Sequence, residues 1–244
     1  MRLRLCRRGA LKHPELPAQR QLERQAAQLA SVRSRLLRRA RIARRRRVLD
    51  LGCGWGAVTG DLRRRAGGIV VAGDRHLRAA ATAGAPAVCA DAHALPFRRA
   101  AFDLVFTHFV WLWLRDPAHV LAEIDRVLAP GGALVAVEAD FGGLIAHPPE
   151  VDLSAVWQEA LASAGADPFI GRTLPPRFAS AGYRVETSMV SPGELGGDLA
   201  LDLLQGLPLS EEAARRVRAA AAHRGPAFVY LPVLGILAEK PRPL

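Results

Sequence analysis

Short apolar segments alternate with amphipathic segments between residues 48 and 138, and this alternation restricts the fold more than any other feature of the chain. Strands that are apolar along their whole length lie in parallel sheets with helices on both faces. The expected strands are Val48–Leu51, Ile69–Gly73, Ala87–Ala90, Leu104–Thr107 and Ala133–Glu138. The expected helices between them are Ala57–Ala66, Leu77–Ala83 and Pro117–Leu128. The sequence therefore predicts an α/β fold built on a parallel sheet.

The pattern changes after Asp140, where a loop rich in Gly and Pro interrupts the alternation. The further elements expected are the helices Leu153–Ala164 and Leu174–Ala181, the strand Arg184–Val190 and the last strand Phe228–Glu239. Neither an internal repeat nor a low-complexity linker occurs in the sequence. We therefore expect one domain, residues 47–244, preceded by a basic N-terminal helical extension, residues 1–46.

Residues 1–47 carry the whole excess of positive charge. They hold 16 basic and 2 acidic side chains, whereas residues 48–244 hold 18 basic and 21 acidic ones. Apolar residues recur at steps of three and four from Leu22 to Ala40, which predicts a helix over Glu15–Arg45 with one face packed on the domain. A solvated helix face in an arginine-biased sequence explains the charge, and nucleic-acid binding through this arm stays the alternative.

Composition excludes several classes of protein. The longest apolar runs, near Leu104–Leu114 and Phe228–Ala238, are too short to cross a bilayer, and no apolar core follows the basic N-terminus as in a secretory signal. The cysteines Cys6, Cys53 and Cys89 are too few and too scattered for a disulfide framework or a zinc site. We therefore expect a cytoplasmic protein without a metal, and an organelle transit peptide is the alternative for the arginine-rich N-terminus.

The segment Val48-Leu-Asp-Leu-Gly-Cys-Gly-Trp-Gly56 predicts a buried strand, a glycine-rich turn and the start of a helix. Glycines let a backbone approach a ligand closely, and such a ligand lies at the helix N-terminus beyond the carboxyl ends of the strands. Gly52, Gly54 and Ala57 also satisfy the dinucleotide pattern G-x-G-x-x-[GA], and Asp74 follows at about the distance of a ribose ligand. On this segment alone, a nicotinamide- or flavin-dependent enzyme is an alternative.

Three further features favour a different nucleotide. Asp50 lies inside the first strand, two residues before Gly52, where a carboxylate suits a positively charged ligand group and would be poorly placed beside a pyrophosphate. The segment Asp91-Ala-His-Ala-Leu-Pro-Phe97 offers a second carboxylate at the end of the third strand, within reach of an adenine amino group. The segment Phe102-Asp-Leu-Val-Phe-Thr-His108 leads into a helix that ends in Arg126-Val-Leu-Ala-Pro-Gly-Gly132 before another strand.

Together these segments resemble the class I S-adenosylmethionine-dependent methyltransferases, of the small-molecule group with the ubiquinone- and menaquinone-type enzymes (methyltransferase type 11). The resemblance extends from about Arg47 to Asp140, and the remainder matches in outline. It implies a Rossmann-like, seven-stranded, mostly parallel sheet with an antiparallel last strand and helices on both faces. It also implies S-adenosylmethionine as cofactor and S-adenosylhomocysteine as its product, with no metal.

The resemblance implies roles for residues at the strand ends. Four residues of the glycine-rich segment would line the methionine end of the cofactor: Asp50, Gly52, Cys53 and Gly54. Asp74 would accept hydrogen bonds from both ribose hydroxyls, a task suited to a carboxylate, and Arg75 would flank the adenine. Asp91 and Ala92 would contact the adenine edge. Two residues at the end of the fourth strand would lie under the methionine, near the sulfonium: Thr107 and His108.

Methyl transfer from a sulfonium needs alignment of the acceptor and exclusion of water, and it needs a base only when the acceptor must lose a proton. His108 is the best placed base, although a structural histidine explains it equally well. The further candidates are His93, Glu138 and Asp140. We assign no catalytic residue. Trp111-Leu-Trp-Leu114 stands where similar proteins often carry paired histidines, which indicates an apolar site wall or simply core packing.

The acceptor pocket is expected between the segment after Asp140 and the N-terminal helix, which could act as a lid over the cofactor. The bulky side chains available to line it are Phe109, Trp111, Trp113, Phe141, Trp157, Phe169 and Tyr183. An apolar pocket with few polar groups suits an aromatic, polyketide or lipid-like acceptor.

The expected function is therefore methyl transfer to an oxygen, nitrogen or activated carbon of a small, apolar or aromatic metabolite of the secondary-metabolite or quinone kind. Enzymes of this fold that methylate amino groups of DNA or RNA usually carry an Asn/Asp-Pro-Pro-Tyr/Phe block where this chain has Thr107-His-Phe-Val110. Carbon-5 methylation of cytosine needs a cysteine nucleophile, and none of the three is suitably placed. The alternatives are an RNA-binding methyltransferase that uses the basic arm, a nicotinamide-dependent oxidoreductase, and an inert member of the fold.

Overall fold

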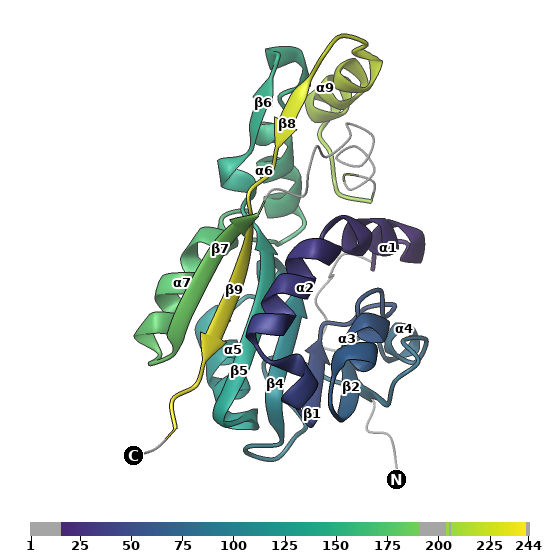
Figure 1. Cartoon of the computed structure of the whole chain (residues 1–244). Coiled ribbons are helices and arrows are strands. Elements are labelled where there is room, and N and C mark those ends of the chain that lie inside the picture. The colour runs from purple at the N-terminus through teal and green to yellow at the C-terminus, as the bar shows by residue number, and fades with distance from the viewer. Residues whose placement is uncertain (1–15, 191–203, 205, 243–244) are drawn as a thin grey trace.

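A computed structural model describes residues 16–190, 204 and 206–242, and a single large sheet dominates it (Figure 1). Its strands are β1 (Arg47–Leu51), β2 (Ile69–Asp74), β3 (Ala87–Cys89), β4 (Phe102–His108), β5 (Leu128–Ala139), β7 (Arg184–Val190) and β9 (Val233–Glu239). The strand order is β3–β2–β1–β4–β5–β9–β7, with β1 to β5 parallel and β9 antiparallel to both of its neighbours. This confirms the Rossmann-like, mostly parallel sheet with an antiparallel last strand.

Helices cover both faces of the sheet. Those that pack on it or connect its strands are α2 (Ala30–Arg39), α3 (Thr59–Arg65), α4 (Leu77–Ala80), α5 (Pro117–Val127) and α7 (Ile170–Ser180). The crossover from β1 to β2 and the crossover from β4 to β5 run in opposite directions along the sheet. Because such crossovers are right-handed, α3 and α5 lie on opposite faces. α2 lies beside α3, and α7 lies beside α5.

Local sequence sets the helix boundaries where capping residues are present. α5 begins after Asp116, whose carboxylate accepts a hydrogen bond from the backbone N–H of His119, and Pro117 occupies its first turn. Its apolar side recurs at helical spacing and is buried against the sheet. The loops that follow the parallel strands and lead into these helices lie at the carboxyl edge of the sheet.

The N-terminal segment forms two helices where one helix was expected over Glu15–Arg45. α1 (Gln19–Gln28) and α2 meet at Leu29, and a short 3₁₀ helix, η1 (Ile42–Arg44), follows before β1, while residue 15 lies outside the described residues. The expected apolar stripe is buried from Ala26 to Ala40, and Leu22 at its start is half-buried. The chain bends at Leu29 because α2 follows the sheet towards β5 and β9, whereas α1 turns towards the glycine-rich turn after β1 (Figure 1).

The expected strand Phe228–Glu239 is also divided. Residues Phe228–Tyr230 form β8, which pairs with β6 (Ile145–His147) in a separate two-stranded sheet, and only Val233–Glu239 enter the main sheet. Pro232 lies at the break, where it has no N–H to donate to a sheet partner. The β6–β8 pair, with α6 (Ser154–Ser163) and α9 (Glu211–Ala222), stands beyond the carboxyl ends of β4 and β5 (Figure 1). The remaining 3₁₀ helices are η2 (Trp111–Trp113), η3 (Phe141–Gly143) and η4 (Pro149–Val151).

Candidate active site

The turn after β1 has a backbone that only glycine adopts easily. Gly52, Gly54 and Gly56 have φ values of 74°, 51° and 81°. The N–H of Gly52 donates to the carbonyl of Gly73 at 2.7 Å, which ties the turn to the end of β2. A Cβ atom on Gly52 would lie 2.4 Å from a methyl group of Val110, so the exit of β4 presses against the same turn.

Two buried aspartates flank this turn. Asp74, at the end of β2, accepts hydrogen bonds from the N–H groups of Gly54 and His76, each at 2.8 Å. Asp50, in β1, accepts one from the hydroxyl of Thr59 at 2.6 Å. Burial raises the pKa of Asp50 to about 7, although the Thr59 hydrogen bond opposes the shift. The turn is therefore fixed by one carboxylate on each side of it.

The remaining cofactor residues expected near β1 to β3 lie at the same edge. Burial, reinforced by the charges of Asp50 and Asp74, raises the pKa of Cys53, so its thiol stays protonated. Asp91 follows β3 and is exposed, whereas Ala92 is buried. Burial raises the pKa of Asp91, but hydrogen bonds from His93 and the charges of His93 and Arg75 outweigh it, and the pKa lies below its ordinary value. Three neighbouring parallel strands thus bring an aspartate each to one edge.

Thr107 and His108 end β4 with side chains on opposite faces, as strand alternation requires. The hydroxyl of Thr107 accepts a hydrogen bond from the indole Nε1 of Trp111 at 3.0 Å, and that indole packs on Phe178 of α7. Burial, with a smaller effect of the Arg33 charge, lowers the pKa of His108 to about 3. Its Nε2 is buried and has no hydrogen-bond partner within the part of the chain that the structure describes. His108 is therefore a neutral imidazole and a weak base.

The carboxyl group of Glu138 supports the loop that follows β4. Its Oε2 accepts a hydrogen bond from the backbone N–H of Trp111 at 2.8 Å, while its buried Oε1 has no partner among residues 16–190, 204 and 206–242. Burial raises the pKa of Glu138 to about 8, although backbone N–H donors oppose the shift. Phe109 in the same loop has a φ of 54°, an unusual value for a residue with a bulky side chain. The carboxyl group of Glu138 thus holds a strained loop, and it is protonated at neutral pH.

The bulky residues expected around an acceptor are divided among several places. Trp111 is fully buried in the core, and Phe141 stacks on Trp157 with ring centroids 4.8 Å apart. Phe169 is exposed at the start of α7. Tyr183 donates a hydrogen bond to Asp125 at the end of α5, which lies at the opposite end of β5 from the site. The carboxyl edge holds all of the expected bulky residues except Tyr183: Phe109, Trp111, Trp113, Phe141, Trp157 and Phe169.

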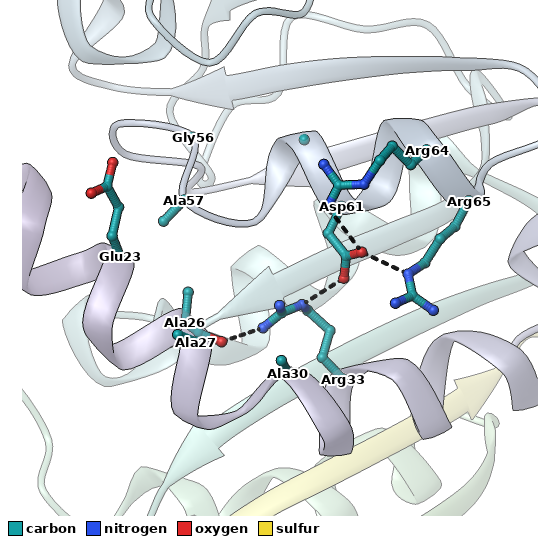
Figure 2. Close-up of a pocket in the computed structure, with 11 residues that line it drawn as sticks. Glu23, Ala26, Ala27, Ala30, Arg33, Gly56, Ala57, Asp61, Arg64 and Arg65 are labelled. Atoms are coloured by element: carbon teal, nitrogen blue, oxygen red, sulfur yellow. Dashed lines mark hydrogen bonds and ion pairs between the residues drawn. The ribbon is translucent and has the colours of Figure 1, made fainter.

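A pocket of about 300 Å³ lies beside the glycine-rich turn, between α1 and α2 on one side and α3 on the other (Figure 2). Arg33 of α2 is buried along it, 3.1 Å from the carboxylate of Asp61 and 2.8 Å from the carbonyl of Ala26. Arg65 also binds Asp61, at 2.7 Å. Gly56 at the end of the turn lines this pocket, so the charge of Arg33 lies close to the turn.

Sequence reasoning missed Arg33 and Thr59, although both act on the expected site. Thr59 follows Asp50 by nine residues at the start of α3, so the position of its hydroxyl after the turn could have drawn attention to it. Arg33 carries no such signal because it is one of many arginines in its segment. Its role is visible only through the packing of α2 against α3.

Known proteins resemble the chain in sequence. The family model for the methyltransferase domain, type 11, matches residues 49–136. A malonyl-[acyl-carrier protein] O-methyltransferase of Pseudescherichia vulneris is 33% identical over 192 residues, which are 77% of this chain and 70% of that protein. Another, of Halorhodospira halophila, is 41% identical over 123 residues, 47% of this chain and 40% of that protein. The chain spans 26 to 52% of the length of three matched curated relatives, one of which is the Halorhodospira halophila protein.

Solved structures show the same fold. A candidate methyltransferase from Bacillus halodurans C-125 matches with a TM-score of 0.62 and 19% identity, over 85% of this chain and 98% of that one. Haemonchus contortus phosphoethanolamine N-methyltransferase 2, in complex with phosphomonomethylethanolamine and S-adenosylhomocysteine, matches with a TM-score of 0.53 and 19% identity, over 82% of this chain and 49% of that one.

The strand order, the glycine-rich turn and the acidic strand ends together define the class I S-adenosylmethionine-dependent methyltransferases. The chain belongs to the methyltransferase type 11 family of this class, whose cofactor is S-adenosylmethionine. Across the described residues, no helix is long and apolar enough to cross a membrane, and no cluster of His, Cys, Asp and Glu has the composition of a metal site.

Proposed function

We propose that this chain transfers a methyl group from S-adenosylmethionine to an oxygen, nitrogen or activated carbon of a small molecule. The observation that carries the proposal is the set of three aspartates, Asp50, Asp74 and Asp91, at the ends of neighbouring parallel strands around a glycine-rich turn. The sequence relatives named as O-methyltransferases support it. When bound, S-adenosylmethionine supplies an electrophilic methyl group on a sulfonium sulfur.

The residues around the turn fit this cofactor by their chemistry. Asp74 has two carboxylate oxygens for the two hydroxyls of a ribose, and the exposed Asp91 can accept a hydrogen bond from an adenine amino group. Asp50 offers a hydrogen-bond acceptor to the ammonium of a methionine end, and the nearby Arg33 offers a positive charge to its carboxylate. We therefore assign the ribose to Asp74, the adenine to the Asp91 side and the methionine end to the Asp50 side.

The site supports transfer by positioning rather than by base catalysis. His108 is too weakly basic to remove a proton from most acceptors, and Glu138 is itself protonated at neutral pH. Neither group therefore supplies a base, so an acceptor that is already a nucleophile suits this site best. What the chain supplies is alignment and exclusion of water, through the strained β4 loop and the surrounding aromatic residues.

We also propose that residues 1–46 act as a cover for the cofactor-binding domain, residues 47–244. Leu16 and Leu22 lie against the turn, because a Cβ atom on Gly54 would meet their methyl groups at 3.6 and 3.3 Å. The indole of Trp55 donates a hydrogen bond to the carbonyl of Pro17 at 2.9 Å. These contacts with the turn support such a cover.

Calorimetric titration with S-adenosylmethionine, S-adenosylhomocysteine and NADH tests the proposed function. We expect micromolar binding of the two sulfur nucleotides and none of NADH. Asp74→Ala should weaken their binding roughly tenfold to a hundredfold, because it removes charge-assisted hydrogen bonds. Since Asp74 also holds Gly54 and His76, the more conservative Asp74→Asn and a thermal unfolding scan distinguish lost contacts from lost fold. Binding of NADH alone would overturn the assignment.

A further inference from the structure

Arg172 is a half-exposed arginine at the carboxyl edge of the sheet that binds the protein through one nitrogen. It lies in the first turn of α7, and its Nε is 2.8 and 3.0 Å from the two carboxylate oxygens of Asp140, at the end of β5. The Asp140 side chain is 9% exposed and that of Arg172 is 49% exposed. Over the described ranges, the Nη1 and Nη2 groups of Arg172 donate no hydrogen bond to another residue.

An exposed aromatic ring lies beside Arg172. Its Cζ atom lies 5.6 Å from the ring centroid of Phe169, which is 41% exposed. A Cβ atom on Gly142 would lie 2.2 Å from that ring and 2.9 Å from Nη2 of Arg172, so a larger residue there would displace both. The guanidinium, the ring and the glycine thus form a cationic surface with an apolar wall.

The start of α7 is fastened to the exits of β4 and β5. The backbone N–H of Asp167 donates to the carbonyl of Leu112 at 2.8 Å, and the N–H of Phe141 donates to the carbonyl of Pro168 at 2.9 Å. In a doubly wound sheet, ligands lie beyond these carboxyl ends. Arg172 therefore stands at the edge where an acceptor has to meet the cofactor.

We propose that Arg172 binds a carboxylate of the methyl acceptor, whose apolar body packs on Phe169. The inference rests on the proposed function and narrows its substrate class to carboxylic acids. A guanidinium fork matches the two oxygens of a carboxylate, and Asp140 acts as a positioning residue that fixes the fork through Nε.

A carboxylic acid acceptor also agrees with the rest of the site. A carboxylate is already ionised at neutral pH, so a methyl group can be accepted by its oxygen without removal of a proton. The neutral His108 and the protonated Glu138 are then sufficient neighbours, because neither is required as a base. A purely structural role for Arg172 is weaker, since a half-exposed ion pair contributes little to stability.

Binding of matched acids and esters tests the inference. The full chain is first saturated with S-adenosylhomocysteine and then titrated with malonyl-N-acetylcysteamine thioester, phenylacetate or hexanoate, each beside its neutral methyl ester. We expect at least one acid to bind about tenfold or more tightly than its ester. Arg172→Met should abolish this preference, and Arg172→Lys should retain part of it. Arg177→Met, five residues further along α7, is the matched control and should change nothing.

A double variant protects the test against misfolding. Arg172→Met leaves the buried Asp140 without its partner, whereas Asp140→Asn combined with Arg172→Met removes both charges together. The inference is overturned if the wild-type chain binds no acid more tightly than its ester, which includes the case that neither binds. It is also overturned if the preference for the acid survives in both variants that carry Arg172→Met. Binding of S-adenosylhomocysteine is measured beforehand. If the chain does not bind it, the proposed function is contradicted, and this result is distinct from loss of the acid preference alone.

Discussion

The two halves of the carboxyl edge differ in how their buried polar groups are satisfied. At the ends of β1 and β2, Asp50 and Asp74 accept hydrogen bonds from groups of the neighbouring turn and helix. At the ends of β4 and β5, His108 and Glu138 each keep one buried polar atom that the described part of the chain leaves without a partner. Satisfied groups form a site that is fixed before the ligand binds, whereas orphaned groups need a ligand or water to complete them.

The same two halves differ in the distance along the chain that their contacts span. Asp50 is bound by a residue nine positions away, and the contact from Gly54 to Asp74 spans 20 positions. The contact between Asp140 and Arg172 spans 32 positions and joins a strand end to a helix in the divergent part of the chain. The half at the ends of β1 and β2, the cofactor half, is therefore encoded locally. The half at the ends of β4 and β5, the acceptor half, depends on how the later segments fold back.

Gly52→Ala should give the largest effect, because the cofactor half has no room to adapt. The residue has a φ of 74°, and a Cβ atom there would lie 2.4 Å from Val110. Backbone strain and overpacking together should lower the free energy of unfolding by roughly 4 kcal/mol and weaken binding of S-adenosylhomocysteine. Gly60→Ala in α3 is the control, because its Cβ atom would meet only Arg64 at 3.6 Å. Urea unfolding and calorimetry measure both effects, and equal stability of the two variants would contradict a rigid turn.

Much of the cofactor half could be predicted from the sequence for the same reason. The strand ends and glycines lie in short segments, so Asp50, Asp74 and Asp91 could be brought to one edge by topology alone. Pro232 also signalled that Phe228–Glu239 cannot be one central strand, but the apolar run around it concealed the break. The bend at Leu29 has neither Gly nor Pro to announce it, since it follows from the packing of α1 and α2 on different parts of the domain.

Glu138→Gln probes the acceptor half through the pH dependence of stability. The pKa of Glu138 is about 8 in the folded chain, above its ordinary value of 4.5, because burial disfavours the charge. The unfolded chain therefore ionises first, and the wild type loses stability as the pH rises from about 4.5 to 8. Glutamine cannot ionise, so the variant should gain about 3 kcal/mol relative to wild type between pH 5 and pH 8.

Chemical unfolding at several pH values measures this difference. Glu150→Gln, on an exposed part of η4, is the control and should show no such pH dependence. A difference between Glu138→Gln and wild type that stays constant with pH would show that the carboxyl group ionises without penalty. The acceptor half would then be as fully satisfied as the cofactor half.

Asp91→Ala should give the smallest effect, because Asp91 is the exposed member of the three aspartates. Its carboxylate accepts a hydrogen bond from the N–H of His93, so it is oriented by its own turn and open to a ligand. Loss of one exposed hydrogen bond to the adenine amino group should weaken S-adenosylhomocysteine binding by about 1 kcal/mol, roughly fivefold. S-inosylhomocysteine lacks that amino group, so it should bind the variant and the wild type alike. Asp152→Ala, which removes a similar turn hydrogen bond to Ser154, should leave both affinities unchanged. If Asp91→Ala weakened the binding of both nucleotides equally, Asp91 would serve its turn alone. The preformed cofactor half would then comprise only the ends of β1 and β2.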